Sequence, residues 1–369
     1  MREPQILIVG LGGVGSWALE FLVRAPGITS IVGADFNEEW GRKRLRTAEA
    51  GAVLQGSCPA LEFVHMDLRD VQATAETIAE LKPQLIFNCT TMQTWWVRYQ
   101  YLTPDKAKQL GEAGAGPWMP THMALARKLM LAIQASGWQT LVINSGFADC
   151  SNMVLAKRGL APTIGLGNID LLVPMIKIGA ARRLGVPISN VSVYAVMHHH
   201  HFGCFRKYST DLPPYFLRIM VGDQDVTGRF DTDRLLHEVV QNYLPGEHLN
   251  PAVAASGVKN AMAMLFDTGL LSHSPGPQGL PGGYPIRLGA SGAEVFLPAG
   301  ISLEQAVAIN ETCQHADGIE RVEDDGTVIY SEKAVQIFKE VLDFDLTSLE
   351  FDECDSRADE LVAHFKALL

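Results

Sequence analysis

The sequence predicts an α/β protein, with an N-terminal doubly wound parallel sheet followed by a C-terminal mixed α+β region. Two observations lead to this prediction. Strand-like and helix-like apolar segments alternate through the first 145 residues, and a glycine-rich turn follows the first of them. At 369 residues, 47% of them hydrophobic, the chain is long enough for two domains, which we place at residues 1–160 and 161–369.

The glycine-rich turn carries the strongest functional signal. Residues 5–23, "QILIVGLGGVGSWALEFLV", contain a buried strand, the spacing G-x-G-x-x-G and an apolar helix. Gly10 permits the tight turn, Gly12 lets the backbone approach a pyrophosphate, and Gly15 lets helix and strand pack closely. The helix N-terminus then faces the phosphate charge. The segment predicts a Rossmann dinucleotide site with contacts from Gly10, Gly12, Gly13, Val14 and Gly15.

The second strand indicates which dinucleotide is bound. It covers residues 30–34 and ends in Asp35, at the position where an acidic residue hydrogen-bonds the adenosine ribose of NAD. Arg42, Lys43 and Arg44 follow closely and could instead hold the 2′-phosphate of NADP, or form a solvated helix face. We expect NAD, with NADP as the alternative.

The alternation continues through strands over 62–68, 83–90 and 139–145 and helices over 70–81 and 120–135. Such an order gives a parallel sheet that binds ligands at the carboxyl ends of its strands. Four polar residues lie at these ends, as cofactor contacts or as satisfied loop residues: Asp67, Asn88, Thr90 and Asn144.

Two long segments are predicted to be loops. Residues 91–118 are long for a connection in a compact domain, and such loops often form lids. Arg98 is the first cation of this segment and is either a clamp for a substrate carboxylate or a solvated surface arginine. The Gly/Pro-rich residues 272–285 are predicted to form a second long loop.

Composition and charge exclude several classes of partner. The net charge of −11 argues against nucleic acid and against an anionic membrane surface. No apolar run approaches the roughly 20 residues of a membrane span, and the first residues do not resemble a signal peptide. The six cysteines lack a CxxC pair, which favours a reduced cytoplasmic compartment over a disulfide framework.

The second half contains a more distant signal. Asn168-Ile169-Asp170 opens an apolar helix, Leu184-Gly185-Val186 ends it, and a strand runs into four consecutive histidines, 198–201. This order resembles the lactate/malate dehydrogenase superfamily, which includes the NAD-dependent glycosidases. Residues 283–311 resemble the late hairpin and C-terminal helix of that family. The first half also has a general resemblance to saccharopine-dehydrogenase-like reductases.

The resemblance implies a set of site residues. Counting on from Val186 places the catalytic histidine of the family at His199, with Asp170 as the carboxylate that orients it, and Arg98 or His122 as substrate contacts. Val173 stands where the family has its substrate-binding arginine, and Gly167 stands where the glycosidases have a metal-binding cysteine. Histidines also replace most of the family's Glu-His-Gly-Asp.

The four histidines allow three interpretations. We expect them on a strand, where side chains alternate between faces. A single imidazole near the nicotinamide would act as general acid and base. His199 and His201 would share a face and, with Cys204 or His122, could instead bind Zn²⁺ or Mn²⁺. Most of the run could also be structural. We adopt the acid/base role and assign no metal ligand.

The combined expectation is an NAD(P)-dependent oxidoreductase that acts on a small polar, carboxylate-bearing substrate and forms a homodimer or homotetramer. One alternative is an NAD-retaining, metal-assisted hydrolase or lyase of the glycosidase type. Another is a protein that senses dinucleotides without catalysis.

Overall fold

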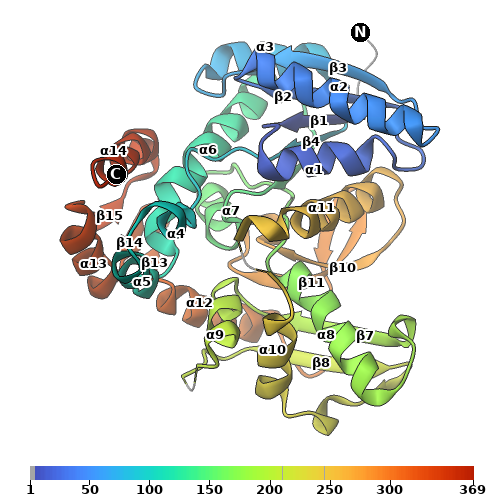
Figure 1. The fold of residues 1–369 in the computed structure, drawn as a ribbon, viewed down its shortest axis with the longest axis vertical. Coiled ribbons are helices and arrows are strands. Elements are labelled where there is room, and N and C mark those ends of the chain that lie inside the picture. Colours follow the sequence, from blue (N-terminus) through green and yellow to red (C-terminus); the bar gives the residue numbers. More distant parts are fainter. Residues whose placement is uncertain (1–4, 210, 245) are drawn as a thin grey trace.

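The computed structural model describes residues 5–209, 211–244 and 246–369. Its first half forms a six-stranded parallel sheet in the order β3-β2-β1-β4-β5-β6 (Figure 1). The strands are β1 (Ile6–Val9), β2 (Ser30–Asp35), β3 (Ala60–His65), β4 (Leu85–Asn88), β5 (Leu141–Asn144) and β6 (Ile164–Gly165). The predicted doubly wound sheet is confirmed, and the two-residue β6 is an addition too short to be recognised from sequence.

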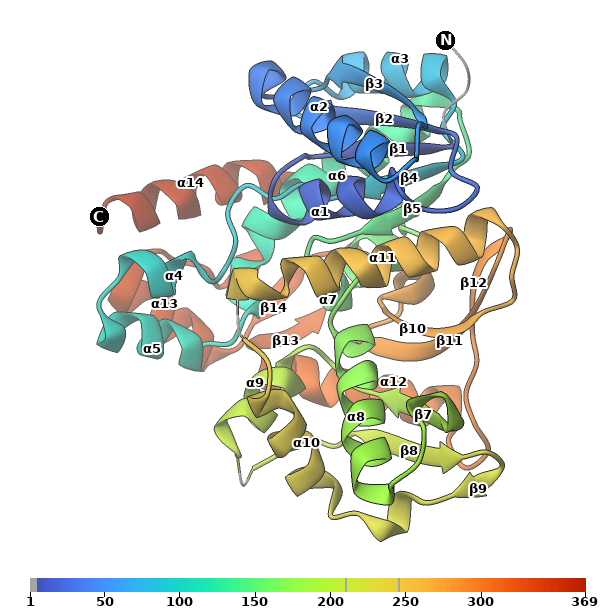
Figure 2. The same cartoon turned by 45° about the vertical axis from the view of Figure 1, so that its right-hand side comes forward.

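Helices cover both faces of this sheet (Figure 2). They are α1 (Gly13–Leu22), α2 (Glu38–Leu54), α3 (Val71–Leu81), α6 (Met119–Ser136) and, from the second half of the chain, α11 (Asn250–Leu265). Leu7 and Val9 pack toward α3 and α6, whereas Ile6 and Ile8 pack toward α1 and α11. Strands buried on both faces need apolar residues at every position, which explains their continuous apolar runs. No described helix combines the length and the apolar character that a bilayer crossing requires.

The described residues of the second half build three small antiparallel sheets, of which two, β7-β8-β9 and β10-β11-β12, precede the C-terminal segment that holds the third, β13-β14-β15. Their elements are α7 (Ala148–Lys157), α8 (Ile169–Leu184), β7 (Val191–Val196), α9 (His200–Lys207), β8 (Phe216–Val221), β9 (Gln224–Asp225), α10 (Thr232–Gln241), β10 (Leu271–Pro275), β11 (Gly283–Gly289), β12 (Gly292–Val295) and α12 (Leu303–Ala316). The long helix that begins after Asn168 and stops at Gly185 is present, as are the hairpin β11–β12 and the helix α12 that follows it.

The C-terminal segment packs against the first half of the chain. It contains β13 (Ile319–Val322), β14 (Val328–Tyr330), β15 (Ser348–Leu349), α13 (Glu332–Leu342) and α14 (Cys354–Lys366). The Trp118 ring lies 5.5 Å from Phe338 and 5.9 Å from Phe365 in edge-on contacts. Arg127 of α6 pairs with Asp352 at 2.7 Å. The predicted boundary near residue 160 assigns this segment to the second domain. Its buried side chains, however, belong to the hydrophobic core on one face of the parallel sheet.

Both predicted long loops contain regular structure. Residues 272–285 include β10 and the start of β11, and the loop prediction is wrong there because Pro275 ends an edge strand, where a missing amide costs nothing. Residues 91–118 contain α4 (Val97–Tyr101) and α5 (Pro104–Glu112). Pro104 at the first position of α5, after Thr103, was a readable signal for a helix start.

The packing of the C-terminal segment predicts the effect of truncating Phe338. This side chain is fully buried in the core that α6 shares with α13 and α14. We expect Phe338→Ala to lower the free energy of unfolding by roughly 3–5 kcal/mol, as is usual for a large cavity. Denaturant unfolding measures this, with the exposed Lys333→Ala as control. An unchanged unfolding midpoint would show that the segment is not part of the cooperative core.

Candidate functional site

The glycine loop lies at the carboxyl end of β1 and leads directly into α1. Gly10 has a φ of +87°, and a Cβ added there would lie 2.9 Å from the Thr90 side chain. A Cβ added to Gly15 would lie 1.8 Å from the carbonyl oxygen of Gly10. At Gly12, an added Cβ meets nothing within 4 Å. The loop is thus closely packed at Gly10 and Gly15 and open at Gly12, which fits a pyrophosphate approaching its backbone.

Gly13 and Val14 form the first turn of α1, whose free amide groups make the helix N-terminus suited to a phosphate. A Cβ added to Gly13 would lie 2.7 Å from Nδ2 of Asn250. The first residue of α11 therefore reaches the glycine loop from the second half of the chain. Nothing in the sequence pointed to Asn250, because no local pattern shows which distant helix will pack there.

Asp35 ends β2 and is buried beside the glycine loop. Its Oδ2 accepts a hydrogen bond from the backbone amide of Leu11 at 2.7 Å, and its Oδ1 accepts one from Asn37 at 2.9 Å. Each carboxylate oxygen has a second lone pair that can accept from a hydroxyl. Asp35 therefore anchors the loop and is able to bind a ribose.

The three cations after Asp35 lie in different environments. Arg42 and Lys43 pair with glutamates one turn earlier on the exposed face of α2, at 2.8 and 2.5 Å. The guanidinium of Arg44 instead lies 4.3 Å from the Trp40 ring centre, and Trp40 Nε1 donates to the carbonyl of Leu11 at 3.2 Å. Arg44 is therefore the member of the trio that is held beside the glycine loop.

The polar residues at the other strand ends are bonded largely to one another. Asn88 Nδ2 donates to Asn144 Oδ1 at 3.0 Å, and the Thr90 hydroxyl donates to Asn88 Oδ1 at 2.7 Å. Both asparagines are buried and tie β4 to β5. Asp67 is exposed after β3 and accepts from the amide of Arg69 at 2.9 Å. Cofactor contacts by these residues stay predictions.

The four histidines do not continue a strand, and the predicted alternation of their side chains is wrong. β7 ends at Val196, and α9 begins at His200. The chain turns because the amides of His201 and Phe202 bond the carbonyls of His198 and His199, which starts the helix. His198 and His201 are consequently buried, whereas His199 and His200 keep some exposure.

His198 and His201 have structural surroundings. His198 Nδ1 accepts from the amide of His200 at 3.3 Å, and its Nε2 lies 3.3 Å from the Cys150 sulfur. His201 Nδ1 accepts from the amide of His198 at 3.0 Å, and its Nε2 lies 3.2 Å from the carbonyl of Pro214. Burial lowers the pKa of both rings, that of His201 to about 4. Both are therefore neutral, and their ring nitrogens are in use.

His199 is different, because neither ring nitrogen has a hydrogen-bond partner among the described residues. Its Nε2 lies 3.2 Å from Asp317 Oδ2, and its ring contacts the edge-on ring of Phe147 at 4.7 Å. The His199 amide donates to Asp149 at 3.0 Å, just after β5. Phe147, with φ of 55°, adopts a backbone conformation rare for a bulky residue. A strained turn at the carboxyl end of the sheet therefore holds this imidazole.

Asp317 joins several parts of the site. Its Oδ1 lies 2.9 Å from His200 Nδ1 and accepts from the amide of Ala115 at 2.9 Å. Although burial acts against its charge, His199 and His200 hold the pKa of Asp317 below its usual range. Burial likewise acts against the His200 cation, but bonds to Asp317 and Cys204 outweigh it and raise the pKa of His200 to about 10.

The prediction that Asp170 orients His199 is wrong. The Asp170 carboxylate is bonded by Lys259 Nζ at 2.7 Å and by the Ser256 hydroxyl at 2.5 Å. Both partners belong to α11, so Asp170 joins α8 to α11 instead. The position beside His199 is taken by Asp317, which lies too far along the chain for any local motif to show the pairing.

His122, on α6, is buried and close enough to interact electrostatically with His199. Burial, with a smaller effect of His199, lowers the pKa of His122 to about 4, so its ring is neutral. Its Nε2 has no hydrogen-bond partner in the part of the chain that the structure describes. The ring centres of His122 and His199 lie 6.0 and 4.7 Å from that of Phe147, so the two imidazoles share this aromatic neighbour.

Arg98 is not a solvated surface arginine, because only 4% of it is exposed. Its guanidinium lies 4.8 Å from the ring centres of both Trp95 and Tyr99, and Nη2 donates to the Tyr99 hydroxyl at 3.2 Å. These contacts lie within residues 91–118, and none of them involves the histidines.

The arrangement of the elements is that of known structures. A lactate dehydrogenase from Cryptosporidium parvum, with lactic acid and NAD, aligns with 86% of this chain and 96% of its own, at 14% identity and TM-score 0.56. A lactate dehydrogenase from Eimeria maxima, with NADH and oxamate, aligns with 85% of this chain and 92% of its own, at 13% identity and TM-score 0.58. A malate dehydrogenase from Plasmodium falciparum aligns with 91% of this chain and 100% of its own, at 13% identity and TM-score 0.55.

This chain has the fold of lactate and malate dehydrogenases. No protein-family model matches its sequence, and no curated protein does. In this chain α8 and β7 directly precede His199.

A cation could approach the same centre through Asp149, His198 and His199, whose ligand atoms lie within 4.8 Å of one another. Zinc bonds of about 2.0–2.1 Å require ligand atoms closer than that. Both nitrogens of His198 are also engaged. The expected pair of His199 and His201 is not formed, because His201 points to Pro214 and Cys313. These residues could hold a metal only after their side chains move.

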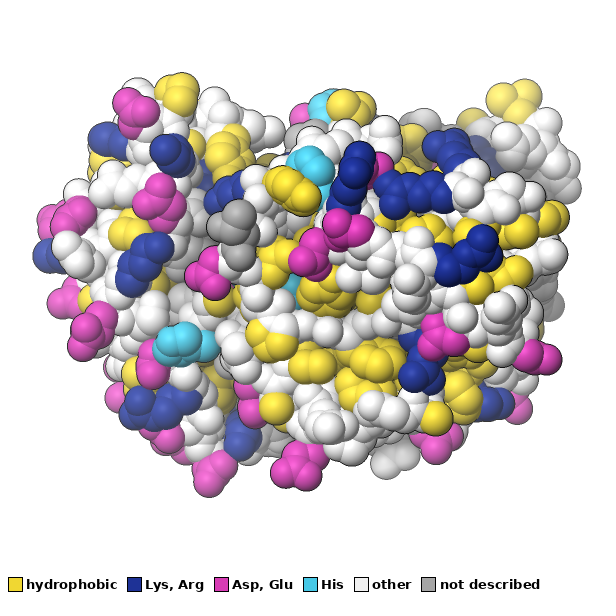
Figure 3. Space-filling view, turned by 90° about the horizontal axis from the view of Figure 1, so that it is seen from below, with side chains coloured by type: hydrophobic (Ala, Val, Ile, Leu, Met, Phe, Trp, Pro, Cys, Tyr) yellow, Lys and Arg dark blue, Asp and Glu magenta, His cyan; other side chains and the backbone are white. Residues whose placement is uncertain are grey.

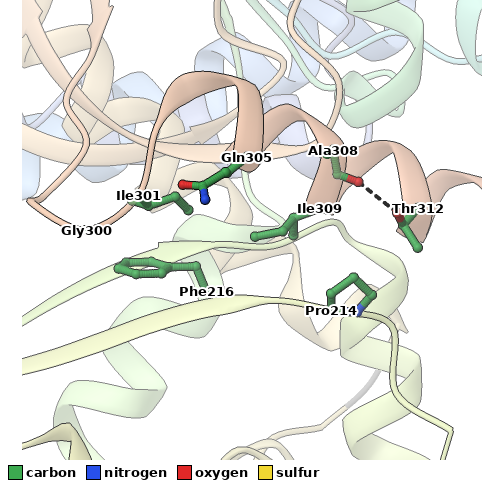
Figure 4. A pocket seen from close by; sticks show the side chains of 8 residues that line it. All are labelled: Pro214, Phe216, Gly300, Ile301, Gln305, Ala308, Ile309 and Thr312. Carbon is green, nitrogen blue, oxygen red and sulfur yellow. Dashed lines mark hydrogen bonds between the residues drawn. The ribbon is translucent and has the colours of Figure 1, made fainter.

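An apolar groove of about 420 Å³ lies away from this centre, between β8 and α12 (Figure 4). Seen from below, hydrophobic side chains gather in the middle of the molecule's face, with charged groups mostly around them (Figure 3). The residues that line the groove include no titratable group, so we assign it no chemistry.

The contacts of Asp317 predict a large effect of its neutralisation. Asp317→Asn leaves the buried His200 cation without its counter-ion, and we expect a loss on the order of 3 kcal/mol in the free energy of unfolding. Asp324→Asn, which removes an exposed partner of Lys157, should change it by about 0.5 kcal/mol or less. Chemical denaturation at neutral pH compares the two. Equal effects would contradict the central role of Asp317.

Proposed function

We propose that this chain is an NAD(P)-dependent oxidoreductase that transfers a hydride to or from a small polar, carboxylate-bearing substrate. The observation that carries the proposal is an imidazole with unbonded nitrogens, His199, beside a buried carboxylate at the same sheet edge as the open glycine loop. The fold is shared with dehydrogenases whose structures hold NAD or NADH with lactic acid or oxamate.

The cofactor we propose is NAD, with NADP as the alternative. Gly12 leaves space for the pyrophosphate, the first turn of α1 faces it, and Asp35 offers acceptors for the ribose hydroxyls. The pairing of Arg42 and Lys43 with glutamates removes two of the three cations that could favour a 2′-phosphate. Arg44 remains as the residue through which NADP could bind.

When bound, the nicotinamide would supply or accept the hydride. His199 would give a proton to the substrate oxygen during reduction and take one from the hydroxyl during oxidation. Asp317 would stabilise the imidazolium that forms, a role for which its low pKa keeps it ionised. His122, which is neutral, would hydrogen-bond the substrate through its free Nε2. Self-association and a cytoplasmic location remain predictions.

A second candidate is a metal-assisted hydrolase or lyase that retains its dinucleotide. The observation that favours it is the grouping of Asp149, His198 and His199. Asp149 is a buried acid whose pKa is raised by burial, and its bonds come from neutral groups, Asn168 and the His199 amide. Metal analysis of the purified protein and activity after chelation separate the two functions, since hydride transfer with His199 as the proton carrier needs no added ion.

The glycine loop predicts the effect of a side chain at Gly12. Because a Cβ added to Gly12 meets nothing within 4 Å, Gly12→Val should keep the fold but place a side chain where the pyrophosphate approaches. We expect NADH binding, measured by calorimetry, to be lost. Gly228→Val is the matched control, because Gly228 is equally open. Retained NADH affinity in Gly12→Val would refute the cofactor site, and a wild-type preference for NADPH would assign the ribose end to Arg44.

The proposed proton carrier predicts the effect of removing the His199 imidazole. His199→Gln should lower kcat by about 10²- to 10⁴-fold while leaving the affinity for NADH nearly unchanged, because it removes an acid/base group and no cofactor contact. His315→Gln, on an exposed part of α12, is the control. Full activity in His199→Gln would exclude this mechanism. NADH binding without turnover of any hydroxy or oxo acid by the wild type would favour a dinucleotide sensor.

A further inference from the structure

Arg98 is the least compensated buried charge of residues 91–118. Only 4% of Arg98 is exposed. Its Nε and Nη1 have no hydrogen-bond partner among the described residues, and no carboxylate of those residues forms an ion pair with the guanidinium. A buried guanidinium without a counter-ion is costly. The aromatic faces of Trp95 and Tyr99 offset part of that cost. An anion would offset more.

A pocket of about 390 Å³ lies next to this guanidinium and is lined by residues of α4, α5 and the end of α9. Two of its lining residues contact or adjoin Arg98. The Tyr99 hydroxyl accepts from Nη2, and a Cβ added to Gly111 would lie 3.5 Å from the same nitrogen. Arg98 itself does not line the pocket, and Gly111 and Tyr99 form the wall between the pocket and the guanidinium. Glycine at this helical position, where alanine would be favoured, keeps that wall thin.

The charge of this pocket is positive. One face of α5 lines it through Pro104, Ala107, Lys108 and Gly111, at the spacing of a single helix face. Lys207 closes it from α9, and none of the lining residues is acidic. The two acidic residues of α5, Asp105 and Glu112, do not line it. Tyr99, Leu102 and Ala107 supply an apolar surface beside the cations.

We infer that this pocket binds a small organic anion, a carboxylate or phosphate ester with a short apolar body. This anion site goes beyond the proposed function, since the residues that line the pocket include neither the glycine loop nor any of the four histidines. Lys207 lies seven residues after His200, which places the pocket about 10 Å along α9 from the start of that helix. The ligand would bridge α5 and α9 through Lys108 and Lys207, and its negative charge would lie behind Tyr99 and Gly111 from the Arg98 guanidinium.

The test measures anion binding without dinucleotide. We expect calorimetry to detect succinate or inorganic phosphate binding to the wild type, and the stronger of the two identifies the carboxylate or phosphate class. Gly111→Leu should abolish this binding by filling the pocket. Lys108→Ala should weaken it by about fivefold, since one partly solvated charge contact is lost. Lys106→Ala, on the same helix but outside the pocket, should leave it unchanged.

Circular dichroism and NADH titration of each variant show that it folds. The inference is overturned if neither anion binds at millimolar concentration, if Gly111→Leu binds as the wild type does, or if Lys106→Ala and Lys108→Ala weaken binding equally. Anion binding lost in Gly111→Leu with NADH binding retained supports it. If the wild type binds NADH but neither anion, the anion site is refuted and the proposed function stands. If it binds an anion but no NADH, the proposed function is refuted and the anion site stands.

Discussion

The buried carboxylate of Asp317 is the interaction on which the arrangement of the site depends. It bonds His200, lies 3.2 Å from His199 and accepts from the amide of Ala115, while its own carbonyl accepts from Gly116. A buried carboxylate is tolerated only when it is paired and hydrogen-bonded. Asp317 meets this condition through contacts that also fix the end of residues 91–118, the start of α9 and the end of α12. The site therefore forms only when all three come together.

The four adjacent histidines divide into two kinds because of where the helix begins. The turn at His199 sends His198 and His201 inward, where burial keeps them neutral and backbone groups and cysteines use their nitrogens. The same turn leaves His199 and His200 facing Asp317. His200 is bonded firmly and carries the charge that balances the carboxylate. His199 keeps its nitrogens free, which is the property that an acid/base group requires.

The glycine loop and the turn that carries His199 are connected through the second half of the chain. α11 covers α1, places Asn250 against Gly13 and holds Asp170 of α8 through Ser256 and Lys259. Asp170 therefore contributes to the site by fixing the relative position of α8 and the glycine loop. The carboxylate beside His199 is that of Asp317, which follows α12, and not that of Asp170 on α8.

The sequence by itself determined the parallel sheet, the glycine loop and the position of His199 after β7. These depend on local properties, such as continuous apolar runs, glycines that alone fit a tight turn, and a helix that ends at Gly185. Tertiary structure decided the rest. Pairings such as His199 with Asp317, Asp170 with Lys259 and Gly13 with Asn250 join residues far apart in the chain, and neither periodicity nor spacing encodes them. The C-terminal segment joined the first core, and Arg98 became buried, for the same reason, since burial is set by which distant surfaces pack together.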